Sequence, residues 1–398
     1  MINIFKIESK RIIKSPLFYV VTILIIAFAV SQIGFDINSD RISKPTIGQE
    51  SYGTYQSSDM EIIKPRALDN LISEYKSNRY TTYPYGFYKA VRLSEEKDIQ
   101  IGKIISALTG ESFETIEKIK TQNTILEHIE IRKDLTNEEF KELMNAVDTA
   151  VGKGSYYGDK YLIGMFGKAE RDYDRALEEY NLIIEEDKIS GAYAKHFSDY
   201  MGISLALIPV FLAVGVWYLD RTSKSQDLLY VRQVKTRDMV WGRYLAMVAS
   251  LAVIILAMAT YYNIRVIAHF GIENIDVLAY YKYTIIWLIP TMMISLGVGT
   301  FLTIVTDSPL GIVVQLAWWF LDINSKYDSI EGGGYGMSLI LRHNTIGNTL
   351  EYMSNVNQIL INRLAYVMIA LIMVAIAEKI YDEKRVEKLG GNFLGKTK

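Results

Sequence analysis

The chain has 398 residues, half of them hydrophobic, a formal net charge of −2 and no cysteine. The missing cysteines exclude disulfides, zinc–thiolate sites, iron–sulfur clusters and thiol nucleophiles. Charge is unevenly spread, because residues 36–199 hold 22 Lys and Arg against 30 Asp and Glu, a balance of −8, and the remainder therefore carries +6.

The N-terminal segment FKIESKRIIKSP (5–16) is the first candidate element. Drawn as a helix, it places four apolar residues and Ser9 on one side and three lysines on the flank, while Ile4 and Ile7 fall outside that stripe. The apolar residues are Ile2, Phe5, Ile12 and Ile13, and the lysines are Lys6, Lys10 and Lys14. This pattern predicts a helix on the inner leaflet that ends where Pro16 turns the chain into the membrane. A plain basic anchor with no further role is the alternative.

Six segments are candidate membrane spans because they are long, apolar and almost free of charge. They are Leu17–Ile33, Tyr200–Leu219, Tyr244–Tyr262, Tyr283–Val305, Leu310–Ile323 and Ile359–Ile380. The first is expected to stay uncleaved. The fifth is short, and it needs protein burial or a half-span geometry to be accommodated.

Basic residues predict the orientation of these spans. Lys and Arg gather before span 1, in the loop between spans 2 and 3, and after span 6. Six spans place all three regions on one side, which the positive-inside rule makes the cytoplasm. Both termini are then cytoplasmic, and residues 36–199 are extracellular.

Residues 36–199 contain good helix signals. Ser94 followed by two glutamates begins one helix and Gly110 ends it, while Thr136 and Glu139 form a capping box. Tyrosines gather at 80–88, where they either pack under a loop or bind a ligand. The sequence thus predicts an all-α polytopic membrane protein with six transmembrane helices and a mainly helical extracellular domain between spans 1 and 2. Its parts are 1–35, 36–199, 200–385 with a cytoplasmic loop at 220–243, and a cytoplasmic tail at 386–398.

The loop between spans 2 and 3, LDRTSKSQDLLYVRQVKTRDMVWGR (219–243), is too long for a tight turn. A short helix from Asp227 to Lys235 would present Leu228 and Leu229, with basic residues around them. Such a helix suits docking into a groove on a cytoplasmic partner. A solvated basic loop is the equally favoured alternative.

Two sets of residues resemble the type-2 ABC transporter permeases. At the N-terminus these are Phe5, Glu8, Lys10, Arg11 and Pro16, which correspond to the interfacial helix of that family. In the loop they are Asp220, Arg221, Asp227, Leu228, Leu229, Arg232, Gly242 and Arg243. The chain departs from the family pattern in two places, since no proline follows the Leu-Leu pair and Arg243 stands where a lysine is usual.

The resemblance implies the transmembrane subunit of an ABC exporter for a peptide or other amphipathic substrate. Its partners would be two copies of a cytoplasmic ABC ATPase, a second permease chain that is identical or homologous, and the lipid bilayer, but no nucleic acid. The loop would be the coupling element. The chain lacks a GxxxxGK[ST] motif, so ATP and magnesium belong to the partner ATPase.

Other functions stay open. A membrane-anchored interaction, immunity or secretion-accessory protein would use the extracellular domain without an ATPase. A membrane enzyme is less favoured, because no span holds a catalytic grouping of side chains. The four histidines are scattered, so neither a catalytic nor a metal-binding residue is predicted, and no cofactor is expected in the chain itself.

Overall fold

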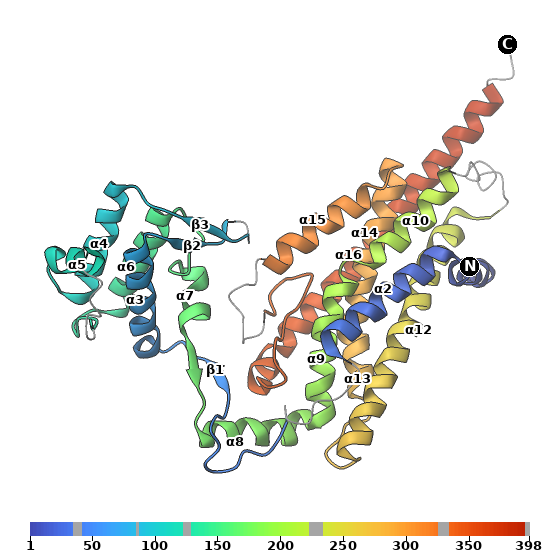
Figure 1. Ribbon diagram of the computed structural model, residues 1–398. Helices are drawn as coiled ribbons and strands as arrows, with labels where there is room; N and C mark the ends of the chain where they lie inside the picture. Colours follow the sequence, from blue (N-terminus) through green and yellow to red (C-terminus); the bar gives the residue numbers. More distant parts are fainter. Residues whose placement is uncertain (35–41, 85–86, 122–128, 223–233, 325–333, 395–398) are drawn as a thin grey trace. The chain divides into compact units, whose positions relative to one another are not determined.

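The computed structural model describes residues 1–34, 42–84, 87–121, 129–222, 234–324 and 334–394 (Figure 1). These residues form two compact units. One, called here the insertion unit, comprises Pro45–Ala176 together with Asn324, and the other, called the bundle, comprises the rest. Apart from Asn324, the insertion unit lies within the predicted segment 36–199, whereas residues 177–199 belong to the bundle.

Helices make up almost all of the bundle. They are α1 (Ile2–Ile13), α2 (Pro16–Ile33), α9 (Lys188–Leu205), α10 (Pro209–Thr222), α12 (Thr236–Phe270), α13 (Ala279–Tyr283), α14 (Ile289–Thr306), α15 (Leu310–Asn324) and α16 (Thr349–Leu394). Helix α8 (Tyr173–Leu182) leads into the bundle, and π-helical turns η3 (Ile183–Asp187) and η4 (Thr284–Leu288) precede α9 and α14. Figure 1 shows α10, α12, α14 and α16 side by side.

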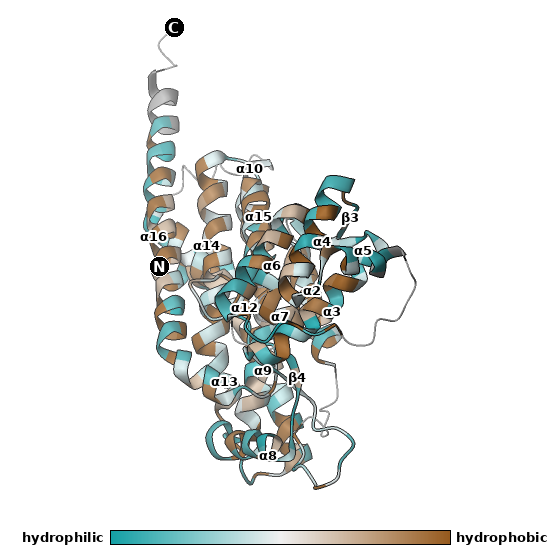
Figure 2. Ribbon diagram, turned by 90° about the vertical axis from the view of Figure 1, so that its left-hand side faces the viewer, coloured by the Kyte–Doolittle hydropathy of each residue, from teal (hydrophilic) through white to brown (hydrophobic). Residues whose placement is uncertain are grey.

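Five stretches of the described chain are long and apolar enough to cross a membrane. They are Pro16–Ile33, Tyr173–Asp220, Thr236–Phe270, Ala279–Thr306 and Thr349–Glu387, and they contain all the predicted spans except the fifth. Figure 2 shows hydrophobic residues over most of α14, as such a helix requires. The fifth predicted span is the 15-residue helix α15. At about 22 Å, α15 is shorter than the roughly 30 Å hydrocarbon core of a bilayer.

The predicted second span is broken in the structure. Helix α9 ends at Leu205 and α10 begins at Pro209, because a proline has no N–H to continue the helical bonds. Two side chains of α15 bond to carbonyls at this break: Gln315 Nε2 donates to Ala206 O at 2.5 Å, and Trp319 Nε1 donates to Ile203 O at 2.9 Å. Apolar surroundings make unpaired carbonyls costly, so α15 stabilises the break.

Small residues bring α10 and α14 into close contact. A Cβ atom at Gly299 of α14 would lie 2.7 Å from Ala213 Cβ and 3.1 Å from the carbonyl oxygen of Val210, both on α10. Small residues of this kind allow apolar helices to pack closely in the absence of a hydrophobic driving force.

The insertion unit combines short helices with two small sheets. Its helices are α3 (Met60–Ser77), α4 (Glu95–Thr109), α5 (Phe113–Thr121), α6 (Asn137–Val151) and α7 (Asp159–Phe166). Strand β1 (Thr54–Gln56) pairs antiparallel with β4 (Lys168–Glu170), and β2 (Tyr80–Thr82) pairs antiparallel with β3 (Lys89–Val91). Leu68, Ile105 and Phe140 are among the residues of its own hydrophobic core.

The predicted helix boundaries in this unit are confirmed. Helix α4 follows Ser94 and ends at Gly110, whose φ of 77° is the left-handed conformation that glycine adopts easily. Thr136 and Glu139 make both bonds of the capping box at the start of α6. Of the tyrosines at 80–88, Tyr80 is buried in the core and Tyr83 lies 3.0 Å from Tyr156, oxygen to oxygen, whereas Tyr88 is exposed.

Candidate functional site

Arg243 of α12 is the centre of a buried charge cluster that joins three helices. Its side chain is 0% exposed. Its Nη1 lies 2.7 Å from Oδ2 of Asp220, near the end of α10, and its Nη2 lies 3.2 Å from Oε1 of Glu8 on α1. The guanidinium also lies over the ring of Trp217, 4.3 Å from its centroid. A buried cation is tolerated only when it is paired, and Arg243 has two carboxylates for this purpose.

Arg11 completes the cluster from the side of α1. Its Nε lies 3.4 Å from Glu8 and its Nη1 lies 3.3 Å from Asp220, so each carboxylate contacts both arginines. Arg11 is 40% exposed, and it also donates to the carbonyl oxygen of Val216. The two positive and two negative charges balance, which is the arrangement that costs least in a poorly solvated site.

Helix α1 packs along the first turns of α12. A Cβ atom at Gly242 would lie 3.0 Å from Ile4 of α1, so a larger residue there would push the two helices apart. The N-terminal ammonium lies 3.0 Å from Asp238, which fixes the other end of the contact. Pro16 occupies the first turn of α2, after Ser15 as the capping residue.

The bundle covers only part of the apolar stripe of α1 that was predicted to lie on the inner leaflet. Of that stripe, Ile12 is buried and Phe5 is half-buried against the protein, whereas Ile2 and Ile13 are exposed. The buried face is rotated towards Glu8 and Ile4, because α1 packs against α12 through these residues as well. Lys10 lies on the exposed side.

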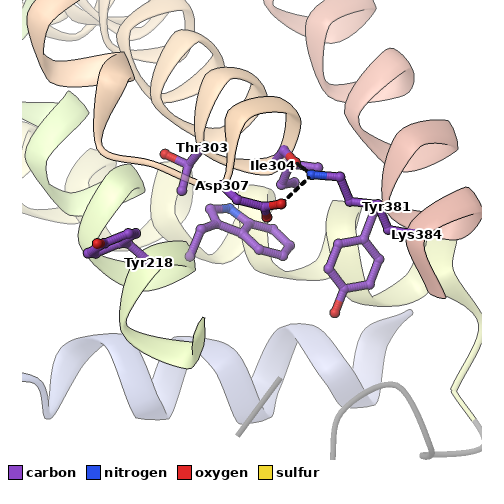
Figure 3. A pocket seen from close by; sticks show the side chains of 7 residues that line it. Tyr218, Thr303, Ile304, Asp307, Tyr381 and Lys384 are labelled. Carbon is purple, nitrogen blue, oxygen red and sulfur yellow. Dashed lines mark hydrogen bonds and ion pairs between the residues drawn. The ribbon is translucent and has the colours of Figure 1, made fainter. Parts of the chain in front are cut away.

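Helix α16 bonds to the beginning of α12 and the end of α14 at this same end of the bundle. Asp382 accepts a hydrogen bond from Thr236 at 2.5 Å, and Arg385 donates to the carbonyl oxygen of Val234 at 2.6 Å. Lys384 pairs with Asp307 at 2.8 Å and donates to the carbonyl oxygen of Ile304, which caps α14 (Figure 3). A small, partly open pocket of about 20 Å³ lies beside this contact, large enough for one water molecule. Its lining residues are Trp217, Tyr218, Thr303, Ile304, Asp307, Tyr381 and Lys384.

Half of the eight predicted loop residues lie outside the described part of the chain. These are Asp227, Leu228, Leu229 and Arg232, and the side chain of Arg221 is not described either. The structure does describe where the loop begins and ends. Asp220 binds Arg243 and Arg11 on one side of it, and Val234 and Thr236 bind α16 on the other.

A second polar cluster, at the opposite end of the bundle, was not predicted. Asp199 of α9 is fully buried and accepts hydrogen bonds from the backbone N–H groups of His343 and Asn344, while Arg342 Nε lies 2.8 Å from it. Lys195, also fully buried, lies 2.6 Å from Asp187. The available signal was the presence of charged residues in the apolar helix 188–205.

The same end of the bundle contains an irregular segment, residues 334–348. Side chains of α15 and α16 bond to backbone groups of this segment. Arg363 of α16 donates to the carbonyl oxygens of Ser338, at 2.6 Å, and Leu339. Asp322 of α15 accepts from the N–H groups of Leu339 and Ile340 at 3.0 and 2.8 Å. Non-helical backbone among apolar helices requires partners of this kind.

In comparisons with known proteins, no family model, no curated protein and no solved structure matches the chain. Among the described residues, no group of three or more His, Asp or Glu side chains is placed to hold a metal ion.

Proposed function

We propose that this chain is the permease subunit of an ABC-type exporter that moves a peptide or other amphipathic substrate across the cytoplasmic membrane, driven by a separate ATPase. The observation that carries the proposal is the cluster around Arg243. Glu8, Asp220 and Arg243 hold positions of the family resemblance, lie far apart in the sequence and meet in one buried ion-paired site.

The cluster also gives a physical reason for the arginine at position 243, where the family usually has a lysine. A lysine has one compact ammonium group, whereas the planar guanidinium of an arginine donates in several directions. Arg243 uses this property to contact Glu8 and Asp220 at the same time. The arginine is therefore compatible with a joint between α1, α10 and α12.

The loop at 220–243 is proposed to transmit the movement of the ATPase. Its start is held by the Arg243 cluster and its end by Asp382 and Arg385 of α16. A displacement of the loop would therefore act on α1 and α12 through one attachment and on α16 through the other. Nucleotide can drive transport only if the ATPase binds two arrangements of this loop with different affinities.

The orientation is part of the same proposal. The end of the bundle that contains α1 has exposed lysines and arginines, which the positive-inside rule assigns to the cytoplasm. Residues 36–199 are then extracellular. Helix α15 and residues 334–348 together make the fifth of six crossings, because α15 alone is too short.

Co-expression with an ABC ATPase encoded beside the gene tests this function. The substitutions Leu228→Asp and Leu229→Asp together should abolish co-purification of the ATPase, and transport with it, since charge removes the apolar contact. The control is Ile272→Asp with Val277→Asp, which changes two exposed apolar residues after α12, at the far end of the bundle. It should leave the complex intact. Full ATPase binding and full transport by the loop variant would refute the coupling role.

One observation favours a second function. The insertion unit has a hydrophobic core of its own, which suits a domain that binds other molecules independently of the bundle. A membrane-anchored interaction, immunity or secretion-accessory protein would have such a domain and no ATPase. If no ATPase co-purifies with the unmodified chain, this second function is supported instead.

A further inference from the structure

Helix α1 has a second face, which the contacts with α12 leave uncovered. Lys6, Lys10 and Lys14 lie on it at successive i, i+4 positions, so they form one row along the helix, and all three are exposed. None of the three has an acidic partner among the described residues. At 1.5 Å per residue the row is about 12 Å long.

The row lies at the level where a membrane surface is expected. Figure 1 shows α1 almost end-on while α2 and α12 are seen from the side, so α1 lies across the direction of the spans. Only Lys14 and Ser15 separate α1 from α2, which is one of the five apolar helices. Beside the lysines, Ile2 and Ile13 are 69% and 46% exposed and supply an apolar edge. A basic row with an apolar edge is the pattern of a helix that lies in the membrane interface.

The start of α12, which lies beside the beginning of α1, adds positive charge near this surface. Lys235 and Arg237 are exposed there and have no acidic partner among the described residues. The carboxylates of α1 and α10 and those at the start of α12 and the end of α14 are engaged within the protein. They are Glu8, Asp220, Asp238 and Asp307, each of which is ion-paired.

We propose that this face of α1 binds the headgroups of anionic phospholipids. The three ammonium groups would contact the phosphodiester oxygens, while Ile2 and Ile13 would lie against the upper part of the acyl chains. Attraction between a basic segment and an anionic membrane acts additively over the charges near the surface. The proposal depends on α1 lying at the membrane and does not require that the chain be a transporter.

Native mass spectrometry of the full chain in a neutral detergent tests the proposal. We expect phosphatidylglycerol to bind more tightly than phosphatidylcholine with the same acyl chains. In the variant K6Q/K10Q/K14Q the affinity for phosphatidylglycerol should fall roughly a hundredfold, while that for phosphatidylcholine, whose headgroup has no net charge, should fall much less.

The matched control is K76Q/K103Q/K141Q. It removes the same charge from three exposed lysines of the insertion unit that likewise have no acidic partner among the described residues. Its lipid binding should equal that of the unmodified chain. A second variant, I2S/I13S, keeps the lysines and should weaken binding of phosphatidylglycerol more than binding of glycerol 1-phosphate.

Three results would overturn the proposal. One is equal affinity for the two lipids, and another is unchanged binding of phosphatidylglycerol by K6Q/K10Q/K14Q. The third is competition by glycerol 1-phosphate at the same concentration as the lipid, which would identify a simple anion site. If the lysine variant instead loses a co-expressed ATPase while lipid binding persists, the row is a protein contact and the proposal is wrong.

Discussion

Nη1 of Arg243 lies 2.7 Å from Oδ2 of Asp220, and the two residues belong to α12 and α10, the helices that follow and precede residues 223–233 in the sequence. Because Glu8 binds the same guanidinium, the N-terminal helix is tied to both sides of that segment by one buried side chain. A single residue therefore controls how three helices meet.

Replacing Arg243 by alanine should be strongly destabilising. Glu8 and Asp220 would lose their main partner in a poorly solvated site, at a cost of about 3–5 kcal/mol. Arg11, which is partly exposed, can offset only part of this cost. Unfolding in mixed micelles with increasing SDS would measure the change.

A double-mutant cycle separates the pairing from the packing of the arginine. Glu8→Gln combined with Arg243→Gln should be less destabilising than the sum of the two single changes, because the double variant leaves no unpaired charge at that contact. Strict additivity would show that Glu8 and Arg243 are not coupled.

Gly299→Ala should destabilise the bundle by about 1–3 kcal/mol, because its new Cβ atom would collide with α10. The carbonyl oxygen of Val210, 3.1 Å away, belongs to the backbone and cannot move aside alone. Gly336→Ala is the control, since nothing lies within 4 Å of its Cβ position and its backbone needs no positive φ. Comparable losses of thermal stability in both variants would contradict this explanation.

Arg363→Met should release residues 334–348 from α16. The carbonyl oxygens of Ser338 and Leu339 would lose their charged donor, and amide hydrogens of this segment should then exchange faster. Mass spectrometry of hydrogen exchange reports this directly. Lys379→Met removes an exposed cation from the same helix and should leave the exchange unchanged, whereas equal acceleration in both would argue against a specific role of Arg363.

The insertion unit should become less stable as the pH rises, because of Glu74. Burial raises the pKa of this carboxyl above its ordinary 4.5, although hydrogen bonds from Tyr157, at 2.6 Å, and from the Thr81 N–H act in the opposite direction. In the folded state the Glu74 carboxyl therefore keeps its proton at a pH where the same group in the unfolded state has lost it. The contribution of Glu74 to the free energy of unfolding is greatest below pH 4.5 and is lost as the pH rises through the pKa of the folded state.

Hydrogen exchange in α3 and β2 of the full chain, corrected for the intrinsic rate, measures this effect. Protection should be lower at pH 7 than at pH 5 in the unmodified chain, and Glu74→Gln should reduce that difference. An identical pH response in the two proteins would exclude Glu74 as its source.

Hydropathy and capping residues predicted much of the fold. Five of the predicted spans fall in helices that meet the criterion for crossing a membrane, and the helix that begins after Ser94 ends at Gly110 as expected. Both signals depend on neighbouring residues in the sequence. The break before Pro209 was missed because an apolar stretch hides it, and because Gln315 and Trp319, which stabilise it, are more than 100 residues away.

Individual residues of the Arg243 cluster could be predicted from the sequence, but their contacts with one another could not. The residues Glu8, Asp220 and Arg243 were singled out by resemblance, but their mutual pairing needs the packing of α1 on α12. The cluster around Asp199 could not be predicted in the same way. Its partners Arg342 and His343 follow some 140 residues later and contribute partly through backbone N–H groups, which no sequence pattern distinguishes.

Helix α16 is unbroken from Thr349 to Leu394, and it is anchored to the bundle near both of its ends. Thr349 donates to Asp187 at 2.7 Å, and Lys384, about 50 Å further along the axis, binds Asp307. A continuous helix resists compression along its axis, so α16 keeps a fixed distance between its contacts with Asp187 and Asp307. Sliding or tilting it at one end obliges the other end to move, whichever end receives the force.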